Sequence, residues 1–161
     1  MASRRPSAST KRSSIAASGA LGGDYDYRRH VLDVRRYTRL SPRQTLNLRA
    51  IAGIGEGTLP PQRLLSIGGF GTVPGYDFKQ ENGGRMVFFD AEYGYRLSRH
   101  IRPLLLYDAG RVFRPLPLSG DEWLQAFGTG LDLGDGFRIE AFWPLDRSRP
   151  AEILIRLRPA F

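Results

Sequence analysis

The feature that most restricts the fold is an alternation of apolar and polar side chains with a period of two residues. It is clearest from Arg85 to Leu97. One set of alternate positions is apolar, whereas the other set holds Phe88, Asp90, Glu92, Gly94 and Arg96. A period of two is that of a β-strand, because successive side chains point to opposite faces of a sheet. The pattern therefore predicts a strand with one apolar face and one polar face.

The same alternation recurs through residues 24 to 161 and predicts about seven strands. The other six cover Tyr27 to Tyr37, Thr45 to Ile54, Ile101 to Phe113, Trp123 to Leu133, Phe137 to Leu145 and Glu152 to Phe161. Short turn-forming segments join most of them, and nothing predicts a helix longer than a turn or two. We therefore expect an all-β fold, an antiparallel meander.

Residues 1 to 23 differ in composition from the rest. They are rich in Ser, Ala and Arg, and they hold four cationic residues and no acid, which is half of the net charge of +8. We predict a disordered basic tail here. Cysteine is absent and the two histidines lie in different segments, so we expect no metal site and no cofactor.

Two kinds of β-protein fit such strands. In a soluble module the apolar face is the core, and in a transmembrane barrel it faces lipid while the polar face lines the lumen. Tyr and Trp near strand ends, such as Tyr95 and Trp143, match the aromatic girdle of a membrane barrel. The polar face mixes Asp, Glu, Arg and Gly, which also favours the barrel.

Residues 59 to 84 form a long segment between the second and third predicted strands. It is glycine-rich and carries apolar residues such as Leu65 and Ile67, so we expect it to fold back and pack. A phosphate-binding loop is excluded because GGFG lacks the Gly-Lys-Ser/Thr that such loops need. Ser66 lies outside any nucleophile elbow, and no catalytic centre is recognisable, so we expect no enzyme.

The stretch GGFGTVPGY, followed by DAEYGYR and LLLYDAG, resembles the C-terminal barrel of the bacterial surface antigen family. There, a GG-x-x-T-x-R-G-[FY] loop precedes a Glu-bearing strand and a D-x-G strand. The matching loop positions are Gly68, Gly69, Thr72, Pro74, Gly75 and Tyr76. The resemblance implies that residues 24 to 161 are the C-terminal part of a transmembrane barrel, and that residues 59 to 84 fold into its lumen.

The resemblance also implies a lumenal ion pair. In the family the loop Arg pairs with acidic residues of the following strands, and these match Glu92 and Asp108. Here Pro74 replaces that Arg. Buried carboxylates need a cation, and Arg96, Arg49 and Arg85, which face the lumen by parity, are the candidates, with Arg96 first.

The chain ends in Phe161, preceded by an alternating strand that contains Leu157. This ending resembles the signal by which outer-membrane barrels are recognised for insertion. The resemblance implies an outer-membrane location, a role in outer-membrane protein assembly or polypeptide translocation, and client polypeptides as partners. Seven strands are fewer than the family's sixteen, so we expect a fragment that needs lipid and a missing barrel half. The alternative is a soluble Arg-rich module that binds nucleic acid.

Overall fold

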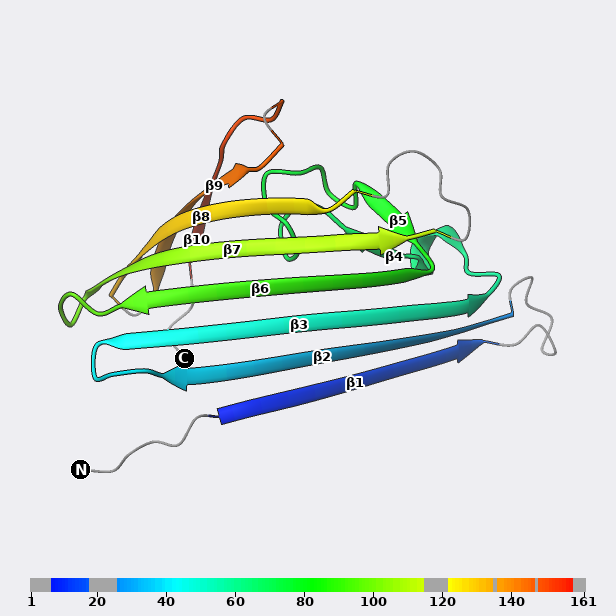
Figure 1. The fold of residues 1–161 in the computed structure, drawn as a ribbon, viewed down its shortest axis with the longest axis horizontal. Coiled ribbons are helices and arrows are strands. Elements are labelled where there is room, and N and C mark those ends of the chain that lie inside the picture. Colours follow the sequence, from blue (N-terminus) through cyan, green and yellow to red (C-terminus); the bar gives the residue numbers. More distant parts are fainter. Residues whose placement is uncertain (1–6, 18–25, 115–121, 135, 147, 158–161) are drawn as a thin grey trace.

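The computed structural model describes residues 7–17, 26–114, 122–134, 136–146 and 148–157. Their main feature is one eight-stranded antiparallel sheet, with strands in the order β1-β2-β3-β6-β7-β8-β9-β10 (Figure 1). The strands are β1 (Ser7–Ala17), β2 (Tyr27–Arg39), β3 (Gln44–Gly57), β6 (Arg85–Tyr95), β7 (Ile101–Phe113), β8 (Leu124–Leu133), β9 (Phe137–Pro144) and β10 (Glu152–Leu157). Each strand pairs with its neighbour in the sequence, apart from the excursion between β3 and β6.

The predicted all-β antiparallel meander is confirmed. The sheet is not closed, because within the described residues β1 pairs only with β2 and β10 pairs only with β9. The architecture is therefore that of a barrel wall that covers part of a circumference. In the part of the chain that the structure describes, no helix is long and apolar enough to cross a membrane.

The predicted disorder of residues 1 to 23 is wrong for Ser7–Ala17, which form β1. This strand pairs along its whole length with β2, from Ser7 opposite Tyr37 to Ala17 opposite Tyr27. The side chains of residues 8 to 14 are all exposed. Backbone hydrogen bonds to the edge of β2 hold the strand, without an apolar face to bury. An amino-acid composition reveals strands that bury apolar side chains. It could not reveal this one, which is held by backbone pairing.

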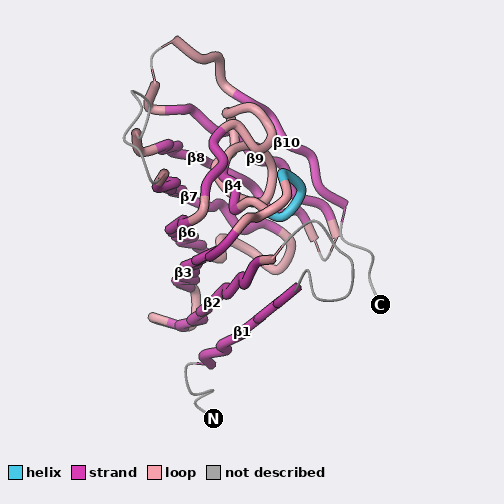
Figure 2. The backbone as a smooth tube through the Cα atoms, turned by 90° about the vertical axis from the view of Figure 1, so that its right-hand side faces the viewer, coloured by secondary structure: helices cyan, strands magenta, loops and turns pink. Residues whose placement is uncertain are grey.

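The sheet curls, and residues 58–84 lie on its concave side (Figure 2). This segment holds a 3-10 turn (Pro61–Arg63) and the short strands β4 (Leu65–Ile67) and β5 (Glu81–Gly83), which pair with each other. The main hydrophobic core lies between this segment and the inner face of the sheet. It comprises Leu65, Ile67, Val73, Tyr76, Met86, Phe88, Leu104, Leu106, Val112, Leu124, Ala126 and Phe142. The predicted fold-back of the loop is thus observed.

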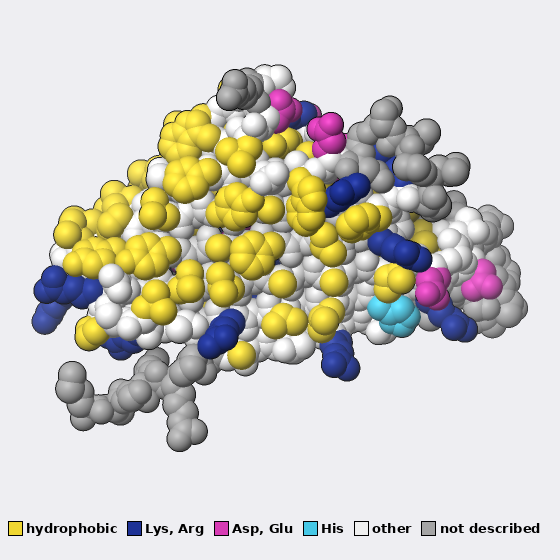
Figure 3. Space-filling view, viewed as in Figure 1, with side chains coloured by type: hydrophobic (Ala, Val, Ile, Leu, Met, Phe, Trp, Pro, Cys, Tyr) yellow, Lys and Arg dark blue, Asp and Glu magenta, His cyan; other side chains and the backbone are white. Residues whose placement is uncertain are grey.

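The opposite face of the sheet is convex and apolar. Two consecutive residues of β6 show the difference between the faces: Phe88, on the concave face, is 3% exposed, and Phe89, on the convex face, is 39% exposed. Other large apolar side chains point outward from β7 to β10: Leu105, Phe127, Trp143, Ile153, Ile155 and Leu157. Figure 3 shows hydrophobic side chains across this face. A contiguous apolar surface of this extent is unusual for a protein that meets only water.

Candidate functional site

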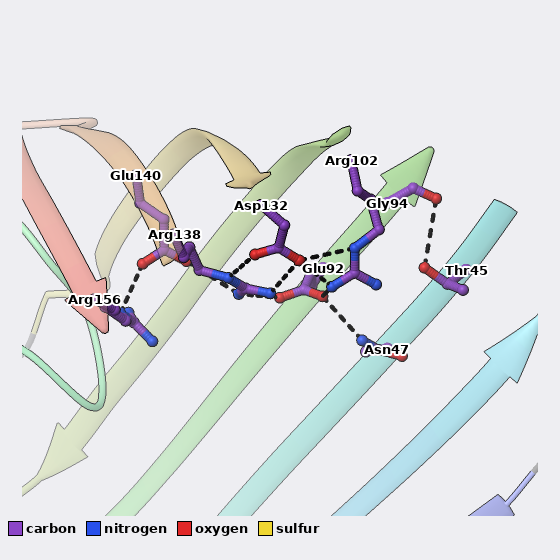
Figure 4. Close-up of polar contacts among 9 residues, drawn as sticks. All are labelled: Thr45, Asn47, Glu92, Gly94, Arg102, Asp132, Arg138, Glu140 and Arg156. Atoms are coloured by element: carbon purple, nitrogen blue, oxygen red, sulfur yellow. Dashed lines mark hydrogen bonds and ion pairs between the residues drawn. The ribbon is translucent and has the colours of Figure 1, made fainter. Parts of the chain in front are cut away.

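Charged side chains from five neighbouring strands meet on the concave face (Figure 4). We call this group the concave network: Glu92 on β6, Arg102 on β7, Asp132 on β8, Arg138 and Glu140 on β9, and Arg156 on β10. The register explains the gathering, because Arg102 lies opposite Asp132 and Asp132 lies opposite Arg138. Side chains directly opposite each other on one face of an antiparallel sheet are close enough to interact.

Arg138 is the centre of the concave network. Its guanidinium contacts three carboxylates, with Nη1 at 2.7 Å from Glu92 Oε2, Nε at 2.5 Å from Asp132 Oδ1 and Nη1 at 3.2 Å from Glu140 Oε1. Its side chain is only 4% exposed. A buried cation with three carboxylate partners is the arrangement in which ion pairs offset their own desolvation.

The remaining members balance the charge. Arg156 Nε lies 2.8 Å from Glu140 Oε2, and Arg102 contacts Asp132 and lies 3.8 Å from Glu92 Oε1. The three arginines therefore match the three carboxylates in number. Asn47 Nδ2 adds a hydrogen bond of 3.0 Å to Glu92 Oε1. The concave network thus joins β3 and every strand from β6 to β10.

Asp108 lies outside this network, although the resemblance groups it with Glu92. It is 5% exposed and directly opposite Asp90 across β6 and β7. Within the described residues neither aspartate has an ion-pair partner. Both line a cavity of about 390 Å³, which Pro74 and Arg138 also line. Pro74, which stands where the resembling family has Arg, therefore lines the same cavity as Asp108.

Within the described residues none of the three candidate lumen cations forms an ion pair with Glu92 or Asp108, although Arg49 lies opposite Asp90 and lines the same cavity. Arg49 pairs with Asp33, Nη2 to Oδ2 at 2.8 Å. Arg96 follows the end of β6 and is exposed. Arg85, at the other end of that strand, has the parity of Phe89 and so lies on the convex face, contrary to its predicted lumenal position. Glu92 instead pairs with Arg138 and Arg102. In the strand predicted from Phe137 to Leu145, Arg138 alternates with apolar residues and so takes the polar face. Parity gives only the face, whereas the partner depends on the register of several hairpins.

The glycine-rich loop motif forms a small closed turn. The Gly68 N–H donates to Thr72 Oγ1 at 2.9 Å, and the Gly69 N–H donates to the Val73 carbonyl at 2.9 Å. Val73 and Pro74 follow this turn and are buried. Thr72 therefore holds the turn together, and the turn directs the apolar residues after it into the core.

The loop is fastened to the last strands of the sheet. The Gly75 N–H donates to Glu152 Oε2 on β10, and the Tyr76 hydroxyl donates to the Gln125 carbonyl on β8 at 3.0 Å. Two arginines stack on loop aromatics: Arg149 lies 5.1 Å from the Tyr76 ring centroid, and Arg156 lies 4.7 Å from that of Phe70. The cations of these contacts, Arg149 and Arg156, belong to β10 and the turn before it. The loop contributes two aromatic rings and the Gly75 N–H. We call these four contacts the loop latch.

The predicted C-terminal signal is only partly within the described residues. Leu157 lies on β10 and is 77% exposed on the convex face. Phe161 lies outside the described residues.

We expect Gly75→Ala to release the loop latch. Gly75 has φ +83°, and an added Cβ would collide with the Pro144 ring. The matched control is Gly71→Ala, where φ is +99° but nothing lies within 4 Å of the added Cβ. Both substitutions strain the backbone, so their difference isolates the collision. Trypsin cleavage at the exposed loop residues Arg63 and Lys79 should be at least about tenfold faster in Gly75→Ala, because a loss of about 1.4 kcal/mol changes an opening equilibrium tenfold. Equal cleavage rates would show that the loop is held elsewhere.

Pro74→Arg should place a cation beside Asp90 and Asp108. The cavity that Pro74 lines is shared with both aspartates, and among the described residues neither has an ion-pair partner. A charge-assisted hydrogen bond there should add about 1.5 to 3 kcal/mol to the free energy of unfolding, relative to Pro74→Met. The Met variant controls for loss of the proline ring. Denaturant unfolding in detergent measures both, and a less stable Arg variant would show that the cations already lining the cavity, such as Arg49 and Arg138, repel it.

The chain is similar to a known outer-membrane protein. The chain is 26% identical over 161 residues to a protein of Nitratidesulfovibrio vulgaris described as outer membrane protein assembly factor BamA. The match covers 83% of this chain and 20% of that relative, so the chain spans about a fifth of its length. No protein-family model matches. The similarity and the all-β architecture agree in indicating a relation to outer-membrane β-barrels.

Proposed function

We propose that this chain is the C-terminal part of an outer-membrane β-barrel that assembles or translocates other polypeptides. The observation that carries the proposal is the division of the sheet into two faces. The convex face exposes large apolar side chains, and the concave face holds a charged network and a packed loop. A soluble β-protein has the opposite arrangement, with apolar residues inside and charged residues outside.

The inner loop supports the more specific role. It packs against the concave wall instead of leaving an open channel, and it is fastened to β8 and β10. The strands are held by their own backbone ladders, so movement of the loop need not unfold the wall, although it would expose the core residues Leu65, Ile67 and Val73. Such a loop suits a barrel whose lumen or wall must change during the passage or insertion of a polypeptide.

The sheet edges support the same role. Within the described residues, β10 has no partner on its far side, and β1 has none on its own far side. Unpaired backbone groups cannot persist in the hydrocarbon core of a bilayer. We therefore propose that further strands of a longer chain complete the wall.

The test of membrane insertion uses the 161-residue chain, whose two open edges we expect to pair with those of a second copy in the bilayer. Refolded from urea, it should gain β-type circular dichroism only with detergent micelles or phospholipid vesicles. In vesicles the strands should resist protease. A monodisperse soluble monomer in buffer that binds single-stranded DNA, more weakly as salt rises, would overturn the proposal and favour the nucleic-acid alternative.

The test of assembly activity uses a chimera. The last fifth of the Nitratidesulfovibrio relative is replaced by residues 24 to 161, and the chimera is placed in proteoliposomes with an unfolded reporter barrel. Folding of the reporter, read by heat-modifiable gel mobility, should be faster than in empty liposomes. A second chimera with Gly75→Ala separates loop function from barrel formation. A chimera that inserts but never accelerates the reporter would contradict the assembly role while leaving the barrel intact.

A further inference from the structure

Two neighbouring hairpin turns at one end of the sheet share a sequence pattern. The β2–β3 turn, residues 39–43, reads RLSPR, and the β6–β7 turn, residues 96–100, reads RLSRH. Both lie at the same end of the sheet (Figure 1). Each therefore presents a leucine and a serine beside two or more basic residues.

The two turns also share a geometry. In each, the leucine and serine N–H groups donate to one carbonyl: that of Gln44 at 3.0 and 3.3 Å, and that of Ile101 at 3.0 and 3.2 Å. In each, the serine Oγ accepts a backbone N–H from two residues later, at 3.2 Å. The repeated serine thus sets the same turn twice, and the turn holds the leucine and the arginines outward.

Backbone hydrogen bonds join these turns to a third. The Arg96 N–H donates to the Arg43 carbonyl at 2.7 Å, and the Gly134 N–H of the β8–β9 turn donates to the His100 carbonyl at 2.7 Å. We call the joined turns, residues 39–43, 96–100 and 134, the short-turn rim. It is one ordered edge and not a set of independent loops.

The short-turn rim is basic and exposed. Arg39, Arg43, Arg96 and Arg99 are all exposed, and among the described residues none of them forms an ion pair with an acid. Arg39 donates to carbonyls of its own turn. The sequence places one acid, Asp135, in the third turn, and it lies outside the described residues. Figure 3 shows Lys and Arg side chains at this end of the molecule.

A hollow of about 250 Å³ lies within the rim. Arg96, Ser98, Arg99, His100, Arg102 and Asp132 line it. The carboxylate of Asp132 is already held by Arg102 and Arg138. The groups left to meet a ligand are therefore guanidinium, imidazole and hydroxyl, which suit an anion.

The exposed leucines identify the kind of anion. Leu40 is 53% exposed and Leu97 is 64% exposed, each directly after an arginine of its turn. A free phosphate or a soluble acid would leave both leucines in water. A membrane interface can bind both the arginines and the leucines. Guanidinium groups form bidentate hydrogen bonds to lipid phosphates, and apolar side chains enter the acyl region.

We infer that the short-turn rim binds the phosphate groups of anionic phospholipids in the leaflet around this end of the barrel. The inference rests on the proposed membrane location and adds a lipid-specific site to it. Near an anionic surface each arginine is worth roughly fivefold in binding. Three of them, Arg43, Arg96 and Arg99, should together favour phosphatidylglycerol over phosphatidylcholine by at least about tenfold.

The test counts lipids that the folded chain retains. The 161-residue protein is folded in non-ionic detergent with equal amounts of phosphatidylglycerol and phosphatidylcholine, and native mass spectrometry measures each adduct. The rim variant is Arg43→Gln, Arg96→Gln and Arg99→Gln together. The matched control is Arg28→Gln, Arg63→Gln and Arg85→Gln, which removes the same charge from exposed residues away from the rim.

The original protein and the control should retain phosphatidylglycerol at least about tenfold over phosphatidylcholine, and the rim variant should retain the two within about threefold. Equal retention by the original protein, or an undiminished preference in the rim variant, would overturn the lipid site and leave the proposed barrel standing. If polyglutamate displaced the lipid at a concentration below that of phosphatidylglycerol, the short-turn rim would be assigned to an acidic polypeptide instead. A chain that gains no β-structure in micelles or vesicles would overturn the barrel, and the lipid site with it.

Discussion

Arg138→Met should be among the most destabilising single changes in this chain. It removes a side chain that is 4% exposed and that contacts Glu92, Asp132 and Glu140. The three carboxylates would keep only Arg102 and Arg156, so the buried group would carry an excess negative charge. Breaking a buried ion pair from one side costs about 3 to 5 kcal/mol. Urea unfolding of the detergent-folded protein, followed by circular dichroism, measures the loss.

Arg85→Met is the matched control for Arg138→Met. Arg85 is exposed and has no ion-pair partner among the described residues, so its substitution should change the free energy of unfolding by no more than about 0.5 kcal/mol. Adding Glu92→Gln to Arg138→Met restores the charge balance and should recover part of the loss. If Arg138→Met proves as mild as the control, water or counter-ions in the cavity compensate the carboxylates, and the concave network is not what holds the wall together.

Leu105→Arg should have a large effect in lipid. Leu105 is 49% exposed on the convex face of β7, between its cross-strand neighbours Tyr93 and Thr129. A cation on the lipid face near the middle of a membrane costs about 2 to 4 kcal/mol. In a soluble protein the same exchange on an exposed face would be nearly neutral. Urea titration of folding into phospholipid vesicles gives the free energy difference.

Leu145→Arg serves as the control for Leu105→Arg. Leu145 is similarly exposed, at 54%, but it follows the end of β9, where a lipid-facing cation costs only about 0 to 1 kcal/mol. The proposal therefore needs a clear difference between the two variants. Equal costs would mean that the convex face does not meet a bilayer core, and they would return the soluble module to consideration.

Much of the fold was readable from the sequence because a period of two is a local property. The alternation from Arg85 to Leu97 gave both the strand and its two faces, and all seven predicted strands match strands of the sheet to within a few residues at most ends. The apolar residues of the glycine-rich loop predicted that it would pack. The exception among the strands is Ser7–Ala17, which has no apolar face and is held by backbone pairing with β2 and a hydrogen bond between Ser14 and His30.

The candidate site depended on more than local pattern. The alternation in the sequence placed Glu92, Arg138 and Glu140 on the polar faces of their strands, and the resemblance added Asp108 and identified Pro74 as the replacement of an Arg. The three-dimensional arrangement was needed to show that Arg138 pairs with Glu92, that Asp108 lies opposite Asp90, and that Glu152 accepts a hydrogen bond from the Gly75 N–H. Alternation predicts on which face of the sheet a side chain lies. Its neighbours on that face depend on the register of each hairpin and on the curvature of the sheet, which brings β10 against the loop.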